Sequence, residues 1–154
     1  MRSNASDAWQ VTLRLLATRD RSSSELRGKL QQRGFAAEEI ETALARAAEI
    51  GYLDDARFAQ NRARSLVRQG KASGPRLQLE LQRHGLDEAD IAQACDAASA
   101  EYPPEQVLRE LLERRYSNFD YHQASDKERS RVVRFFQRRG FSLSQVLAIL
   151  KEER

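Results

Sequence analysis

Residues 30–35 are LQQRGF, and the same short phrase returns twice, as LQRHGL at 81–86 and as FQRRGF at 136–141. The glycines of successive copies are 51 and then 55 residues apart. Apolar positions on both sides of the phrase also match between the copies. Self-similarity at a nearly constant period is typical of one helical unit that is stacked several times. Stacked units present an extended surface, so we expect a binding surface in preference to a single catalytic cleft.

Each copy of the phrase is expected to close the middle helix of a three-helix unit. Ser22 and Ser125 each have a glutamate three residues later, which is the capping-box pattern of a helix N-terminus. In the middle unit, Ser73 is the expected cap and Pro75 lies in the first turn, where its missing N–H costs nothing. A glycine just past the last turn is the usual left-handed helix end. The recurring glycine therefore has a backbone role that requires no catalytic function.

The whole pattern predicts an all-α protein with about nine helices and no strand. The opening helix of each unit is expected at 7–19, 55–69 and 105–116. One longer connection is expected at 117–124. We expect three tandem three-helix repeats in an elongated, curved arrangement, at residues 1–52, 53–102 and 103–154.

Composition places the chain among ordered, helix-rich proteins. It has 154 residues, of which 40% are hydrophobic and 32% are charged, and only three prolines. No apolar run approaches the ~18 residues that a membrane-spanning helix needs. The first residues lack the apolar core of a secretion signal, and a single cysteine cannot form an internal disulfide. We therefore expect a cytoplasmic protein, and a monomer, since stacking of the repeats uses the apolar surface.

Charge is distributed in blocks, although the net charge is only +3. Residues 57–85 contain seven basic residues and one acidic residue, and residues 127–139 contain six basic residues and one acidic residue. Between these blocks, residues 87–105 contain six acidic residues and no basic one. Such alternation suits a protein that contacts nucleic acid or an acidic protein surface in some places and avoids it in others. The plainer interpretation is a solvated surface in an arginine-rich protein.

Few residues are suited to catalysis. The two histidines, His84 and His122, lie in different units, and His84 occupies the slot that arginine fills in the other two copies of the phrase. That slot favours a polar or cationic role at a helix end over metal binding. Cys95 aligns with apolar core positions, and Asp54 is better explained as a helix N-cap than as a metal ligand. We expect no enzymatic activity, no cofactor and no metal site.

Basic residues gather on one face of two predicted helices. At 100° per residue, one narrow stripe opposite Val132 and Phe136 contains Lys127, Arg131, Arg134 and Arg138. A cationic face opposite an apolar face is expected of a packed helix that offers charge to a partner. The candidate partner-binding or DNA-binding residues are Arg57, Arg64, Arg68, Lys71, Arg76, Lys127, Arg131, Arg134 and Arg138.

These basic faces are compatible with phosphates, with an acidic protein surface, or with solvent alone. Phosphate contacts would be sensitive to salt and independent of base sequence. Few Asn or Gln residues accompany the basic faces to read base edges, and no aromatic platform is present to stack single-stranded bases. Sequence-specific reading of a nucleic acid is therefore not expected.

Several motifs in combination resemble the RecX family. They are LLA at 15–17, SEL at 24–26, GF at 34–35, GYLDD at 51–55 and RRGFS at 138–142. The resemblance covers roughly residues 11–150. It implies three tandem three-helix repeats, in agreement with the helix pattern described above.

The resemblance also implies a bacterial, non-enzymatic regulator of the RecA recombinase. Such a protein binds the RecA filament, reaches into its groove, and inhibits ATP hydrolysis, strand exchange and co-protease activity. The resemblance supplies no catalytic residue and does not identify the basic faces as the contacts. Two rival interpretations stay open: a general DNA-binding helical module that acts without recombinase, and a helical scaffold for another protein.

Overall fold

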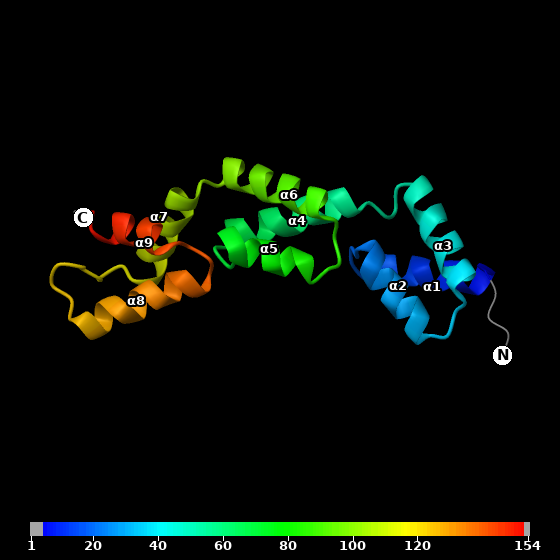
Figure 1. Ribbon diagram of the computed structural model, residues 1–154, viewed down its shortest axis with the longest axis horizontal. Coiled ribbons are helices and arrows are strands. Elements are labelled where there is room, and N and C mark those ends of the chain that lie inside the picture. The colour runs from blue at the N-terminus through cyan, green and yellow to red at the C-terminus, as the bar shows by residue number, and fades with distance from the viewer. Residues whose placement is uncertain (1–4, 153–154) are drawn as a thin grey trace.

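The computed structural model describes residues 5–152, and within this range every regular element is a helix (Figure 1). The first unit contains α1 (Ala5–Thr18), α2 (Ser23–Gln32) and α3 (Ala37–Glu49). The second contains α4 (Asp55–Arg68), α5 (Gly74–Gln82) and α6 (Glu88–Glu101), and the third contains α7 (Pro104–Arg115), α8 (Asp126–Arg138) and α9 (Leu143–Leu150). For the described residues, the prediction of an all-α protein with about nine helices is confirmed.

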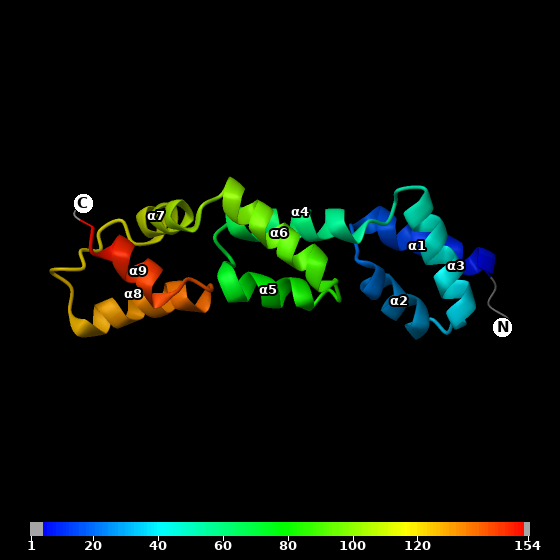
Figure 2. The same ribbon diagram turned by 45° about the horizontal axis from the view of Figure 1, so that its top comes forward.

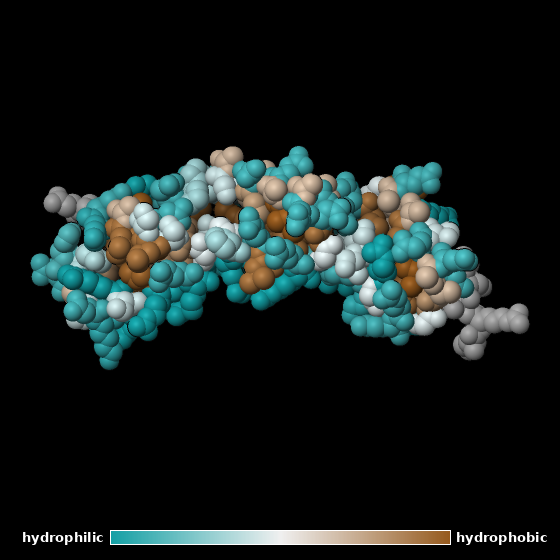
Figure 3. Space-filling view, in the orientation of Figure 1, coloured by the Kyte–Doolittle hydropathy of each residue, from teal (hydrophilic) through white to brown (hydrophobic). Residues whose placement is uncertain are grey.

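The three units follow one another along an elongated, arched body, with the first and third units at opposite ends of it (Figure 1). The middle helices α8, α5 and α2 lie end to end along one edge, and a view turned by 45° shows the same row (Figure 2). This row forms the concave edge of the arch, which is mostly hydrophilic (Figure 3). The predicted elongated and curved arrangement is therefore confirmed.

Buried apolar side chains form two separate cores. One core belongs to the first unit alone and includes the fully buried Leu26 and Leu30 of α2, with Trp9 of α1 packed against it. The other core runs without interruption from Phe58 in α4 to Leu150 in α9. The second and third units therefore share one apolar interior, and the first unit is joined to them mainly by polar contacts described below.

The recurring glycine ends each middle helix as the sequence predicts. The φ angles of Gly34, Gly85 and Gly140 are 85°, 68° and 99°. They lie in the left-handed region, which residues other than glycine rarely adopt. Gly34 and Gly140 directly follow the C-cap residues of α2 and α8, and Gly85 lies two residues after the C-cap of α5. The prediction of a left-handed helix end is confirmed in all three units.

The helix N-termini follow the predictions in most places. The Asp54 side chain accepts a hydrogen bond from the Arg57 backbone N–H at 3.0 Å, which confirms its role as the N-cap of α4. At α8, the Ser125 hydroxyl accepts from the Glu128 N–H at 3.2 Å, and the Glu128 carboxylate accepts from the Ser125 N–H at 3.1 Å. This reciprocal arrangement is the full capping box that the sequence predicts.

Two of the predicted caps are only partly right. At α2, the Ser22 hydroxyl accepts from the Glu25 N–H at 3.2 Å, but the Glu25 carboxylate does not return to the Ser22 backbone. At α5, Ser73 occupies the N-cap position but its side chain makes no capping bond. The Glu25 carboxylate pairs instead with His84 of the next unit, and at α5 it is the Ser73 backbone N–H that bonds to the next unit; a local sequence pattern cannot reveal either contact.

Candidate partner-binding surface

The basic stripe of the third unit forms one exposed surface along α8. Lys127, Arg131, Arg134 and Arg138 line a single open hollow together with Asp126 and Ser130. All four cations are exposed, and within residues 5–152 none of them forms an ion pair with a carboxylate. The opposite face of the helix is held in the core by the buried side chains of Val132, Phe135 and Phe136. We refer to these four cations as the α8 stripe.

Most of the basic candidates of the middle unit are engaged inside the molecule. A guanidinium nitrogen of Arg57 donates to the Gly51 carbonyl at 3.1 Å. Arg64 forms an ion pair with Glu101 at 2.7 Å, and Arg76 forms one with Glu80 at 2.9 Å. The exposed residues Arg68 and Lys71 carry no ion pair in the described part of the chain. The α8 stripe is therefore the larger group of uncompensated cations among the candidates.

Two further arginines extend the basic surface at the end of α8, and the sequence pattern did not single them out. The guanidinium carbon of Arg139 lies 3.7 Å from the centroid of the Phe135 ring, and that of Arg115 lies 5.4 Å from it. Burial lowers the pKa of Arg139, and the charges of Arg115 and Arg138 act in the same direction. Arg139 lies four residues after Phe135, at the end of the same helix, whereas Arg115 reaches the ring only through the packing of α7 against α8, which periodicity within one helix could not predict.

The second and third units meet through main-chain groups. The Ser73 N–H at the start of α5 donates to the Arg139 carbonyl at the end of α8, at 2.7 Å. Gly140 packs so closely against this site that a Cβ at its position would collide with the Ser73 carbonyl oxygen. The junction thus pairs an N–H group that begins one helix with a carbonyl group that ends another, two groups that a helix itself leaves unsatisfied.

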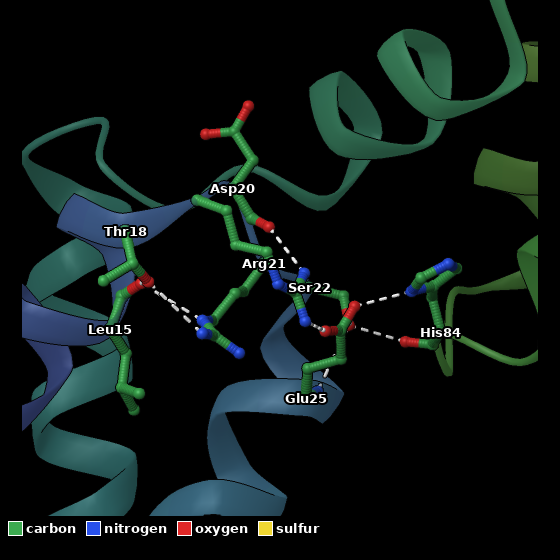
Figure 4. A network of polar contacts seen from close by, with 8 residues as sticks. Leu15, Thr18, Asp20, Arg21, Ser22, Glu25 and His84 are labelled. Atoms are coloured by element: carbon green, nitrogen blue, oxygen red, sulfur yellow. Dashed lines mark hydrogen bonds and ion pairs between the residues drawn. The ribbon is translucent and has the colours of Figure 1, made fainter. Parts of the chain in front are cut away.

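The first and second units meet in a network of side chains (Figure 4). The Ser22 hydroxyl donates to the His84 carbonyl at 2.6 Å, and Nδ1 of His84 lies 2.6 Å from the Glu25 carboxylate. Arg19 pairs with the same carboxylate at 2.8 Å. The His84 ring also lies edge-on to Phe58, with centroids 5.0 Å apart. The predicted polar role of His84 at a helix end is confirmed, and its partner lies in the neighbouring unit.

The electrostatics of Glu25 follow from this position. Burial of its carboxyl acts to raise its pKa, but hydrogen bonds from His84 and Arg19 and the charge of Arg19 outweigh burial. The pKa of Glu25 is therefore lower than its ordinary value. The carboxylate consequently stabilises the junction while it is ionised.

The two junctions are built from equivalent positions of the repeat. Ser22 and Ser73 are the N-caps of α2 and α5, while His84 and Arg139 both come directly before the glycine that ends a middle helix. In each junction the start of one middle helix therefore meets the end of the middle helix that follows in the chain. This repeated contact explains the row of α8, α5 and α2 seen in Figures 1 and 2.

The described residues contain no group of three or more His, Cys, Asp or Glu side chains placed to hold a metal ion. Among the helices of residues 5–152, none is long and apolar enough to cross a membrane. Cys95 is partly buried against the core of the second and third units, and burial raises the pKa of its thiol. Its position fits the predicted packing role.

An array of stacked three-helix units with an exposed basic face defines a class of helical-repeat binding proteins. Family models match each of the three units: the first three-helix domain of RecX at residues 8–46, the second at 54–94 and the third at 104–150. The chain belongs to the RecX family of regulatory proteins, which are not enzymes.

Curated relatives agree with this assignment over almost the full length. The chain is 37% identical to the regulatory protein RecX of Syntrophotalea carbinolica over 148 residues, which are 96% of this chain and 97% of that protein. It is 40% identical to the regulatory protein RecX of Trichlorobacter lovleyi over 136 residues, 88% of each chain.

Solved structures show the same fold. A crystal structure of a regulatory protein RecX superposes with a TM-score of 0.79 at 23% identity, covering 96% of this chain and 73% of that chain. The crystal structure of RecX from Lactobacillus salivarius superposes with a TM-score of 0.72 at 18% identity, covering 96% and 94%. At these identities the likeness concerns the fold alone.

Proposed function

We propose that this protein binds the filament of the bacterial RecA recombinase and inhibits its ATP hydrolysis, strand exchange and co-protease activity. In this proposal the elongated body lies in the filament groove in the cytoplasm and contacts more than one recombinase protomer. The protein is a modulator without catalytic residues of its own. The observation that carries the proposal is the RecX-type array itself, with the unpaired α8 stripe on its third unit.

The α8 stripe is the proposed main contact. Its first and last cations, Lys127 and Arg138, are 11 positions apart, which corresponds to about 16 Å at the rise of an α-helix. Exposed arginines of this kind fit acidic side chains of a protomer or DNA phosphates inside the groove. Arg68 and Lys71 of the second unit would add weaker contacts. Several weak contacts on one rigid body gain from effective concentration, so no single unit needs high affinity.

The acidic segment of residues 87–105 is proposed to lie away from the DNA. It forms α6 and the start of α7. The cations of α8 and the carboxylates of α6 thus belong to different helices of the array. Because its positive and negative charges lie on different helices, the body would insert the edge that carries the α8 cations into a negatively charged groove.

The test is single-strand-dependent ATP hydrolysis by the cognate recombinase while the protein is titrated in. We expect inhibition at well below one protein per protomer, which would favour capping or disassembly of the filament over coating of its groove. Absence of any effect at stoichiometric excess, with filament binding also absent, would contradict the proposal.

Gel mobility of labelled DNA over a salt series separates this proposal from the rival DNA-binding module. The proposal expects a strong shift only when the recombinase is present. Tight, salt-sensitive binding of duplex DNA without recombinase would favour a general DNA-binding function instead.

A further inference from the structure

The row of middle helices has two ends at which the repeated junction is left open. Inside the chain, the start of α2 meets the end of α5, and the start of α5 meets the end of α8. Within the part of the chain that the structure describes, the end of α2 and the start of α8 meet no other middle helix. The helix row therefore contains two complete junctions, and each end of the row carries one side of a further junction.

The open end of α2 has the features of the filled junctions without their partner. A Cβ on Gly34 would meet nothing within 4 Å, whereas one on Gly85 would collide with Ser24 and one on Gly140 with Ser73. Arg33, which occupies the slot of His84, is exposed and has no ion pair in the described part of the chain. The backbone around Gly34 therefore leaves room for another helix to approach closely, as the backbone around Gly85 and Gly140 does.

The open start of α8 carries the complementary groups. Ser125, Asp126 and Glu128 are all exposed. Glu128 occupies the position of Glu25, the residue that pairs with His84 across the filled junction. At the start of α2, where the second unit is present, Glu25 does not complete the capping box and pairs with His84 across the junction. At the start of α8, which meets no other middle helix in the described part of the chain, Glu128 closes on its own N-cap.

We propose that a second copy of this chain docks head to tail on these two ends. In this contact the start of α8 of one copy meets the end of α2 of the next, and Glu128 faces Arg33 as Glu25 faces His84. Acidic groups at the start of a helix then meet a basic group at the end of another, which is the favourable sense for both helix dipoles. The inference concerns contacts between copies and does not rest on the proposed action on RecA.

Such a contact is heterologous and does not close, so it generates an open row of molecules. The interface is small and polar, and a solvent-exposed ion pair contributes little by itself. Free chains therefore remain monomeric at ordinary concentrations. The row forms where copies are already held in line, because their effective concentration is then high.

Sedimentation velocity of the protein alone, at low salt and up to about 1 mM, tests the contact at the weak affinity expected. Wild-type protein is expected to show a sedimentation coefficient that rises with concentration. Glu128→Gln keeps a side chain that can form the capping box but removes the charge, and Arg33→Glu reverses the charge at the other end. Each single change should weaken association about fivefold or more.

Charge exchange supplies the specific control. An equimolar mixture of Arg33→Glu and Glu128→Arg proteins restores an opposite pair at every contact, so association should return to near the wild-type level. Arg62→Glu places the same charge change in the middle of α4, away from both ends, and should leave association unchanged. Circular dichroism verifies that each variant is folded.

Three results would overturn the proposal. The first is wild-type protein that remains monomeric at about 1 mM and low salt. The second is undiminished association of Arg33→Glu and Glu128→Gln. The third is failure of the charge-exchanged mixture to associate when the single changes have abolished association.

Discussion

The Ser73 N–H and the Arg139 carbonyl, 66 positions apart in the chain, are joined by a hydrogen bond of 2.7 Å. The bond brings Gly140 against the Ser73 carbonyl, where no side chain fits. The glycine of the repeated phrase therefore has two roles. It ends a middle helix in the left-handed conformation, and at Gly85 and Gly140 it also allows the preceding middle helix to approach.

These two roles are separable by mutation. Gly34→Ala strains only the left-handed backbone and should lower the free energy of unfolding by about 1–2 kcal/mol. Gly140→Ala carries the same strain and also forces the second and third units apart, so we expect a loss of about 3 kcal/mol or more. Urea denaturation of both variants measures the difference. Equal losses would show that the close approach of Gly140 adds nothing to stability.

The α8 stripe should matter more for partner binding than the basic residues of the middle unit. Replacing Arg131, Arg134 and Arg138 with Ala should leave helix content unchanged and weaken inhibition of the recombinase about tenfold. Within residues 5–152 these side chains form no ion pair or hydrogen bond, so we expect the effect to arise from lost contacts with the filament.

The matched control removes three arginines whose charges are engaged inside the chain. Replacing Arg57, Arg64 and Arg76 with Ala should weaken inhibition less than the α8 change does. Midpoints from ATPase titrations, with circular dichroism as the folding check, compare the two triple variants. An unaltered midpoint for the α8 variant would refute the stripe as the contact.

Acid should selectively weaken the junction between the first two units. Because the pKa of Glu25 is lowered in the folded chain, its contribution is fully present above the ordinary carboxyl pKa and is lost as pH falls through the folded value. Glu25→Gln should therefore cost about 1 kcal/mol at neutral pH, and this cost should shrink as acid protonates the carboxylate of the wild-type chain. The measurement is the free energy of unfolding across this pH range.

An exposed pair provides the comparison for Glu25. Glu41 pairs with Arg27 at 2.7 Å, but its side chain is 58% exposed. Glu41→Gln should change stability by no more than about 0.5 kcal/mol at neutral pH. A pH-independent effect of Glu25→Gln would contradict the role of its ionised form in the junction.

The two separate cores predict two levels of protection in hydrogen exchange. Amides of α2 and α3 depend on the small core of the first unit, whereas those of α5 and α8 depend on the larger shared core. We expect the first unit to exchange through an opening of lower free energy, with α5 and α8 exchanging together. Identical protection of all middle helices would show that the chain opens as one unit.

The sequence could predict the helices because local rules determine them. Glycine ends, serine and aspartate caps and apolar periodicity all act within about ten residues, and the observed opening helices lie within two residues of the expected ranges. The grouping of Lys127, Arg131, Arg134 and Arg138 also follows from the helix period alone. The predicted unit boundaries after residues 52 and 102 remain a prediction.

What the sequence could not predict depends on contacts between helices. Glu25 matches a capping box, yet its carboxylate is held by His84 from another unit. Arg115 joins Arg139 at the Phe135 ring only after α7 and α8 have packed. Likewise, the internal pairing of Arg64 with Glu101 is invisible in a count of basic residues.

The separation of the two cores also bears on how the chain folds during synthesis. The first core is complete once Leu53 has left the ribosome, because all of its members precede α4. The second core has to wait for Val146 and Leu150 near the other end of the chain. The first unit can therefore fold early and independently, while the nascent second unit keeps apolar surface exposed until the third has been made.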